Sequence, residues 1–261
     1  MTRWHVVLSD PAGGSPETLA PWFAARGGMA LIDAKRAARH AWGMLAEDLT
    51  ETEAQAARAA AAEMGLPAAC VSDDHFRPLT DPLPVSGLHL DGSSLRWTSG
   101  SPPAPLPAVA SASIRLLSFA SIRRDSLVKR VVKEQASGAR RLAGLGIMLT
   151  TGIPVGLGGT TEVSRTMAST EWIVFLDVLG EESRWRVTPE RFDFSGLGAG
   201  KGVGGPENTR RLLEALRAAA PGALLNRGAQ TLLAGRPLSG AGYDDLDDVE
   251  KETRWLLALA K

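Results

Sequence analysis

Ser99-Gly-Ser-Pro-Pro-Ala-Pro-Leu-Pro-Ala-Val-Ala-Ser111 is the stretch that divides this chain. It holds four of the seven prolines found between Pro78 and Pro107. Proline cannot donate to a β-ladder or continue a helix, so we expect an extended, solvated segment outside any core. It separates an alanine-rich, helix-patterned N-terminal part from a C-terminal part that begins with strand-like sequence. The sequence therefore predicts two domains, residues 1–80 and 111–261, joined by residues 81–110, a hairpin followed by a proline-rich linker.

The composition of the 261 residues is typical of a globular protein, with 44% hydrophobic and 22% charged residues and a net charge of zero. The single cysteine, Cys70, excludes an internal disulfide framework and a multi-thiolate metal site. The first ten residues lack a signal-peptide core. The uncharged stretch 142–161 contains six glycines and a proline, which makes it a poor spanning helix. We expect a cytoplasmic protein without a transmembrane segment.

The N-terminal residues predict a β-α-α-β-α-β order with short connections. Thr50 followed by Glu53 forms a capping box, which begins the helix predicted over Glu51–Met64, and Gly65 ends it. The other predicted elements are strands at residues 4–8, 42–46 and 66–72 and helices at residues 16–27 and 31–40. A domain of this size is expected to pack its helices on one face of a small sheet, as an α+β sandwich.

The capped helix, the glycine and the strand that follows it, Thr50 to Val71, resemble the second half of small ferredoxin-like modules. The peptidoglycan-binding SPOR domains and the C-terminal domain of the ribosomal stalk protein share this rhythm over about 70 residues. The chain has a second helix, residues 31–40, that SPOR domains do not need. The resemblance implies a fold for residues 1–80 and nothing about their ligand.

The C-terminal residues predict an antiparallel, β-rich domain with long helices at its end. Hairpins are expected over residues 86–98, with Asp91-Gly92 as the turn, and over residues 171–188. A strand is predicted at residues 113–123 and helices at residues 206–220 and 246–260. Residues 125–144 fit both helical and strand spacing, and we favour a strand. This layout resembles pleckstrin-homology-like domains, and the whole chain resembles bacterial two-domain proteins without an assigned activity.

The glycine-rich segment Ser195–Gly205 lies between a predicted strand and a helix, where phosphate-binding loops occur. It contains a G-x-G-x-x-G match at Gly200, Gly202 and Gly205. Gly202 stands where a P-loop requires serine or threonine, and no acidic strand end follows at the distance that a dinucleotide site requires. We therefore interpret the segment as a flexible connector. The acidic run Asp244–Glu250 lacks the spacing of a calcium loop and suits the first turn of a helix.

Asp73, Asp74 and His75 are the residues from which a metal site or an acid–base pair could be built, because they end a predicted strand. A metal ion needs three or four convergent groups, and the segments of His5 and His40 show no partner motif. A strand-end turn with solvated carboxylates is the interpretation that we favour.

Seven basic residues lie within residues 123–141, and residues 111–165 hold nine Lys or Arg against three Asp or Glu. Such a block can neutralise phosphates of a nucleic acid or of an anionic membrane surface. It has no interleaved aromatic residues for base stacking, and a solvated strand or helix face is the interpretation that we favour. The candidate residues for an anionic partner are Arg123, Arg124, Lys129, Arg130, Lys133, Arg140 and Arg141.

The sequence assigns no catalytic, cofactor-binding or metal-ligating residue. We therefore expect a non-enzymatic interaction or regulatory protein, an adaptor whose partner is another protein and which uses no cofactor. Two alternatives stay open: an enzyme with scattered active-site residues around Asp73, Asp74 and His75, and a weak binder of anionic partners through residues 123–141. The seven tryptophans lie among apolar neighbours and are predicted to be core, with Trp172 and Trp185 as alternative contact residues.

Overall fold

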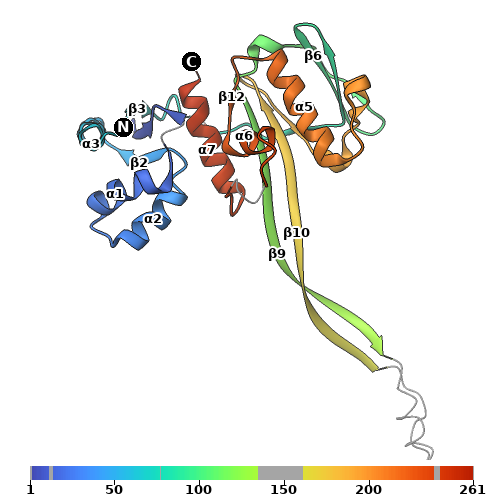
Figure 1. Cartoon of the computed structure of the whole chain (residues 1–261), viewed down its shortest axis with the longest axis horizontal. Helices are drawn as coiled ribbons and strands as arrows, with labels where there is room; N and C mark the ends of the chain where they lie inside the picture. Colours follow the sequence, from blue (N-terminus) through green and yellow to red (C-terminus); the bar gives the residue numbers. More distant parts are fainter. Residues whose placement is uncertain (1, 12–13, 77, 135–160, 238–241, 261) are drawn as a thin grey trace, which may run out of the picture. The chain divides into compact units, whose positions relative to one another are not determined.

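The protein is described by a computed structural model, which confirms the predicted α+β class (Figure 1). The structure describes the backbone of residues 2–11, 14–76, 78–134, 161–237 and 242–260, and the side chains of these residues except 124–134 and 161–170. The helices are α1 (Pro16–Gly27), α2 (Leu31–Arg39), α3 (Glu51–Glu63), α5 (Gly205–Ala219), α6 (Arg227–Leu233) and α7 (Leu246–Leu259). The strands are β1 (Trp4–Leu8), β2 (Met44–Leu49), β3 (Ala68–Ser72), β4 (Leu83–Val85), β5 (Gly87–Asp91), β6 (Ser94–Ser99), β7 (Ala104–Pro105), β8 (Val109–Ala110), β9 (Leu116–Glu134), β10 (Thr161–Leu179), β11 (Arg184–Val187) and β12 (Leu224–Leu225).

The chain divides into two compact units at other positions than the sequence predicts. The first unit contains residues 1–122 and 173–261, and the second contains Arg123–Trp172. Residues 1–80 and most of residues 111–261 therefore belong to the same unit. The predicted linker, residues 81–110, lies entirely within that unit.

The N-terminal part has the predicted order of elements, β1-α1-α2-β2-α3-β3. Its three strands form a sheet in the order β2-β1-β3, and β1 is antiparallel to both neighbours. Strands β2 and β3 are thus parallel to each other, so β2-α3-β3 is a split β-α-β unit around β1. Thr50 accepts from the Glu53 backbone N–H at 3.4 Å, and the Glu53 carboxylate accepts from the Thr50 N–H at 2.9 Å, as the capping box predicts.

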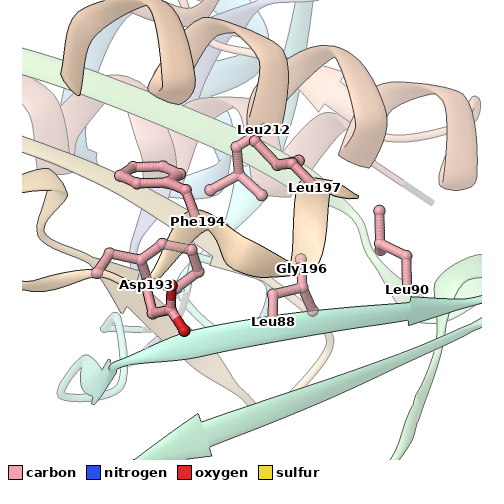
Figure 2. Close-up of a pocket in the computed structure, with 8 residues that line it drawn as sticks. Leu88, Leu90, Asp193, Phe194, Gly196, Leu197 and Leu212 are labelled. Carbon is pink, nitrogen blue, oxygen red and sulfur yellow. The ribbon is translucent and has the colours of Figure 1, made fainter. Parts of the chain in front are cut away.

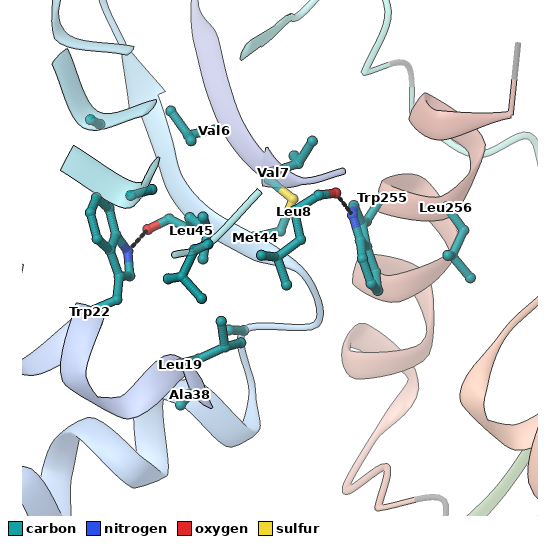
Figure 3. Packing of buried hydrophobic residues seen from close by; sticks show 14 of the residues in the cluster. Val6, Val7, Leu8, Leu19, Trp22, Ala38, Met44, Leu45, Trp255 and Leu256 are labelled. Atoms are coloured by element: carbon teal, nitrogen blue, oxygen red, sulfur yellow. Dashed lines mark hydrogen bonds between the residues drawn. The ribbon is translucent and has the colours of Figure 1, made fainter. Parts of the chain in front are cut away.

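The core of this N-terminal sheet is completed by α7, from the opposite end of the chain. Val6, Val7 and Leu8 of β1 are fully buried, and Trp255 and Leu256 of α7 belong to the same hydrophobic cluster (Figure 3). The Trp255 indole Nε1 donates to the Leu8 carbonyl at 2.8 Å. The N-terminal sheet and α7 therefore share one hydrophobic core.

A five-stranded sheet lies at the centre of the first unit, in the order β12-β9-β10-β11-β4. The predicted hairpin is present, because β10 pairs antiparallel with β11, with Leu179 opposite Arg184. The two outer pairs, β12 with β9 and β11 with β4, are parallel, so the antiparallel sheet predicted for this region is a mixed one. Strand β4 comes from the predicted linker, which therefore contributes to the sheet rather than only joining two domains.

The proline-rich run forms part of a third sheet. Strands β5 and β6 are the predicted hairpin, and the short strands β7 and β8 pair with β6. Thr98 of β6 lies opposite Pro105, and Leu95 lies opposite Val109. The run is extended and largely exposed, as expected, but it folds back along β6 instead of spanning between two bodies.

A buried polar network fixes α6 and α7 against β9. Asn226 caps α6 and pairs with the backbone of Phe119 through two hydrogen bonds of 3.0 Å, as a neighbouring strand would. The Tyr243 hydroxyl accepts from Asn226 Nδ2 at 2.9 Å and donates to the carboxylate of Glu252, which also accepts from the Arg227 N–H at 3.0 Å. Burial raises the pKa of Glu252 and that of Tyr243. The mutual hydrogen bonds make this network a structural element.

Candidate functional site

The three residues proposed from the sequence for acid–base chemistry, Asp73, Asp74 and His75, lie in the turn after β3. The carboxylate of Asp73 lies 2.7 Å from the Nε2 atom of His5, a histidine that the sequence left without a partner. The Nδ1 atom of His75 lies 3.1 Å from the hydroxyl oxygen of buried Ser72. Asp73 and His75 therefore contact different groups, and the three residues do not converge on one point.

Asp74 and His75 line a cleft of about 490 Å³, which lies within the first unit. Its walls come from the turn after β3, the residue before β9, the β10–β11 turn and α7. The volume is in the range of small-molecule sites. The residues that give the cleft its chemistry are His75, Thr80, Arg115, Ser183, Arg254 and Leu257. Three carboxylates, of Asp74, Glu181 and Glu182, also lie along it.

The two arginines of the cleft are held differently. Arg115 donates through NH1 to the Ala260 carbonyl at 3.4 Å and lies 4.0 Å from the carboxylate of Glu181, which is 81% exposed. The guanidinium of Arg254 lies 5.4 Å from the centre of the Phe76 ring. Among the described residues, no oxygen atom accepts a hydrogen bond from the Arg254 guanidinium. Both arginines line the same cleft.

A second cluster of polar residues joins α2 to α7 in a way that the sequence did not predict. His40, Asp244 and Asp248 bring potential ligand atoms within 4.8 Å of one another. His40 Nδ1 lies 3.2 Å from Asp248 and its Nε2 lies 3.6 Å from Asp244, while the Trp42 indole donates to Asp248 at 2.6 Å. The carboxylates contact different ring nitrogens of His40, so this arrangement is a set of polar contacts around the ring rather than a cage around one ion.

The basic block lies largely on β9. The backbone of residues 123–134 is a strand, which agrees with the favoured prediction for this segment. Arg123 is exposed, whereas the side chains of Arg124, Lys129, Arg130 and Lys133 lie outside the described part of the structure. Residues along a strand alternate between its faces, so odd-numbered and even-numbered positions of the block belong to opposite faces. Arg140 and Arg141 lie outside the described residues.

Strands β9 and β10 are neighbours in the five-stranded sheet (Figure 1), and residues from Arg123 of β9 and up to Trp172 of β10 belong to the second unit. We call residues 123–134 and 161–172 the ribbon. Among the strands that the structure describes, β9 pairs with β12 at Leu116 and Leu117 alone, and β10 pairs with β11 from Leu176 to Leu179. In the ribbon each strand therefore has one described strand neighbour, so it offers one edge to a further strand.

The first part of the glycine-rich segment, residues 195–200, lies against β5, whereas residues 201–204 form a loop that contains fully exposed Val203. Phe194–Gly200 form two short 3-10 turns, separated by a kink at Gly198, that lie against β5. Figure 2 shows Gly196 beside Leu88 under the side chains of Leu197 and Leu212. A Cβ atom at Gly196 would lie 1.8 Å from the Leu88 carbonyl oxygen, so only glycine fits there. The space between these side chains is too small for a water molecule, so this segment is a covering layer of the core.

The tryptophans predicted to be core are mostly buried, with one clear exception. Trp185 is 7% exposed and stacks on fully buried Trp97 at a ring distance of 6.0 Å. Trp172, on β10, is 47% exposed. Of the two alternative contact residues that the sequence named, Trp172 is therefore the accessible one.

Sequence reasoning missed Arg115 and Arg254 because the cleft brings together residues up to 186 positions apart, from Asp74 to Ala260. Neither arginine belongs to a local motif. No helix in the described part of the chain has the length and hydropathy needed to cross a membrane. Comparison of the chain with known protein families, with curated proteins and with solved structures finds no match.

Proposed function

We propose that this chain is a non-enzymatic interaction protein that binds a partner protein through the ribbon. The observation that carries this proposal is the extent of β9 and β10, which are 19 residues long each and continue beyond the sheet that pairs with them. A two-stranded ribbon is at best marginally stable in water by itself. Added backbone hydrogen bonds from a partner's extended segment would stabilise it.

The distribution of positive charge favours a protein partner over a polyanion. Strand geometry places Arg123, Lys129 and Lys133 at positions of one face and Arg124 and Arg130 at positions of the other. Basic residues on an open strand edge also oppose edge-to-edge aggregation, which gives them a role without any anionic ligand. The alternative is binding of a nucleic acid or an anionic membrane surface through residues 123–141. The experiment must distinguish it from binding of a protein.

The enzyme alternative has less support from geometry. His75 lies in a cleft, but the hydroxyl near its ring belongs to buried Ser72, and Asp73 is paired with His5. A general base must lie within hydrogen-bond reach of the proton that it takes and of the group that orients it. The cleft supports binding better than proton transfer.

We expect a photo-crosslinking side chain at Trp172 to capture one defined protein from an extract of the producing cells. The same crosslinker at Val203, which is fully exposed in the loop before α5, is the matched control. Excess unlabelled full chain should abolish the Trp172 product, because the site is saturable. Equal capture at both positions, or capture that resists competition, would contradict the proposal.

A titration of the full chain with a duplex DNA and with phosphatidylserine vesicles separates the anionic alternative. At about 50 mM and 200 mM salt, binding through five or more phosphate contacts should weaken by orders of magnitude. Such a loss, without a competed crosslink, would replace the protein partner by an anionic one. Absence of binding at the lower salt concentration removes the anionic alternative.

A further inference from the structure

We propose that the cleft beside His75 binds a small oxyanion, a carboxylic acid or a phosphate ester, that carries an apolar body. This site is independent of the ribbon and goes beyond the interaction function proposed above. Its residues come from four separated segments of the first unit and line about 490 Å³.

The anion would be held by the two guanidinium groups. Arg254 is half-buried. In the described part of the structure, its guanidinium carbon lies 5.4 Å from the centre of the Phe76 ring, and no described group accepts a hydrogen bond from it. A guanidinium carries five N–H donors in a fixed fork that matches a carboxylate or phosphate group. The Phe76 ring lies on one side of this guanidinium, and among the described residues none accepts a hydrogen bond from its N–H groups.

Arg115 supplies the second cation from the other wall. Its hydrogen bond to the Ala260 carbonyl, at 3.4 Å, uses one of its donors. Its ion pair with Glu181 is long, at 4.0 Å, and the glutamate is 81% exposed, so this pair is weak and an entering oxyanion can replace it. The two arginines thus present more donors than the described residues use.

His75 adds an imidazole ring to the lining of the cleft. When the Ser72 hydroxyl donates to Nδ1, at 3.1 Å, the proton of the neutral ring lies on Nε2. The hydroxyl groups of Thr80 and Ser183 also line the cleft. These groups complete a set of donors that an oxyanion with two or three oxygens can satisfy.

The remaining lining restricts the class of ligand. Leu79, Leu179 and Leu257 form the apolar part of the cleft, which favours a ligand with an apolar body. Asp74, Glu181 and Glu182 lie along the same cleft and repel a polyanion. A nucleic acid therefore does not suit this site, whereas a small molecule with one oxyanionic group does.

Benzoate and phenyl phosphate are suitable probes for the two sources of an oxyanion, and neutral benzamide is the control for the apolar body. In amide NMR titrations of the full chain, we expect benzoate or phenyl phosphate to shift the signals of His75, Gly180 and Ser183. The probe with the lower Kd identifies the preferred headgroup. Benzamide should bind at least tenfold more weakly than the better acid, because hydrogen bonds to a charged group are about twice as strong as neutral ones.

Arg254→Gln should raise the Kd of the better probe about tenfold or more, and Arg115→Gln should do the same. Arg96→Gln is the matched control, because Arg96 is exposed on β6 and pairs with exposed Asp91 outside the cleft. Arg254→Lys keeps the charge without the fork and should bind with intermediate affinity. An unchanged amide spectrum elsewhere shows that each variant is folded. Absence of binding by both acids at 10 mM, equal binding of benzamide, or an unchanged Kd in folded Arg254→Gln would overturn the proposal.

Discussion

Trp255→Ala is expected to lower the free energy of unfolding by about 3–5 kcal/mol, the range for removing a buried large aromatic side chain. Trp255 is 3% exposed, and its ring packs so closely on Gly43 that a Cβ atom there would lie 2.1 Å from it. The substitution also removes the donor to the Leu8 carbonyl. Because this ring joins α7 to the N-terminal sheet, the loss should appear in the cooperative unfolding of the whole first unit, measured by urea denaturation.

Two further variants separate the contributions to this loss. Trp255→Phe keeps most of the buried ring and removes the N–H donor, so we expect about 1–3 kcal/mol. Trp172→Ala, at an exposed tryptophan, should change the stability by no more than about 0.5 kcal/mol. If Trp255→Ala unfolds residues 1–80 alone and leaves a second transition unchanged, the shared core is not what holds the two ends of the chain together.

Asp177→Asn is expected to destabilise the chain by about 3–5 kcal/mol, because it removes one partner of a buried ion pair. The Asp177 side chain is 1% exposed and that of Arg184 is 2% exposed, with 2.7 Å between the carboxylate and NH2. Arg186, opposite Asp177 on β11, donates to the same carboxylate through Nε at 2.7 Å. Without the negative charge, Arg184 keeps only a 3.3 Å contact to Glu250 as its described carboxylate partner.

Arg186→Gln is the matched control, since the Arg186 side chain is 20% exposed and Asp177 keeps its bond to Arg184. We expect a smaller loss than for Asp177→Asn. The double change Asp177→Leu with Arg184→Leu should recover much of the lost stability, because an apolar pair leaves no buried charge unpaired. A loss of less than about 1 kcal/mol in Asp177→Asn would show that this ion pair is not essential to the sheet.

The elements that the sequence predicted well are those fixed by short-range contacts. The capping box of Thr50 and Glu53 begins α3 at the predicted residue. The predicted hairpin of β5 and β6 is present, but its two turn residues are Gly92 and Ser93, one position after the predicted Asp91-Gly92, because Asp91 pairs with Ser94. Each depends on groups no more than a few residues apart, and such signals are visible in the sequence itself. The favoured strand over residues 125–134 is also present.

The domain organisation could not be predicted in the same way because it depends on distant residues. Trp255 and Leu8 are 247 positions apart, and nothing near either residue indicates the other. Proline density correctly predicted an extended run, yet proline is tolerated at sheet edges, where β7 and β8 lie. An extended segment therefore does not by itself imply a linker.

The candidate site also combines residues that a local motif identifies with residues that only the fold brings together. Asp74 and His75 were named from a local motif and do line the cleft, but Asp73 is turned to His5, 68 positions away. The cleft takes its positive charge from Arg115 and Arg254. Arg115 directly precedes β9 and Arg254 lies on α7, and neither belongs to a recognisable sequence motif. The partners of His40 are Asp248 on α7 and Asp244 just before that helix, and both are likewise more than 200 positions away.

The most direct test of the ribbon as the binding element is competition by a chain in which residues 124–171 are replaced by a short glycine-containing turn. The first unit holds the described cores, so this chain should unfold within about 4 °C of the full chain, which corresponds to about 1 kcal/mol. Added in excess, it should leave the crosslinked product at position 172 of the full chain unchanged. If the shortened chain is folded and abolishes that product as well as the full chain does, the partner binds elsewhere and the ribbon is not its site.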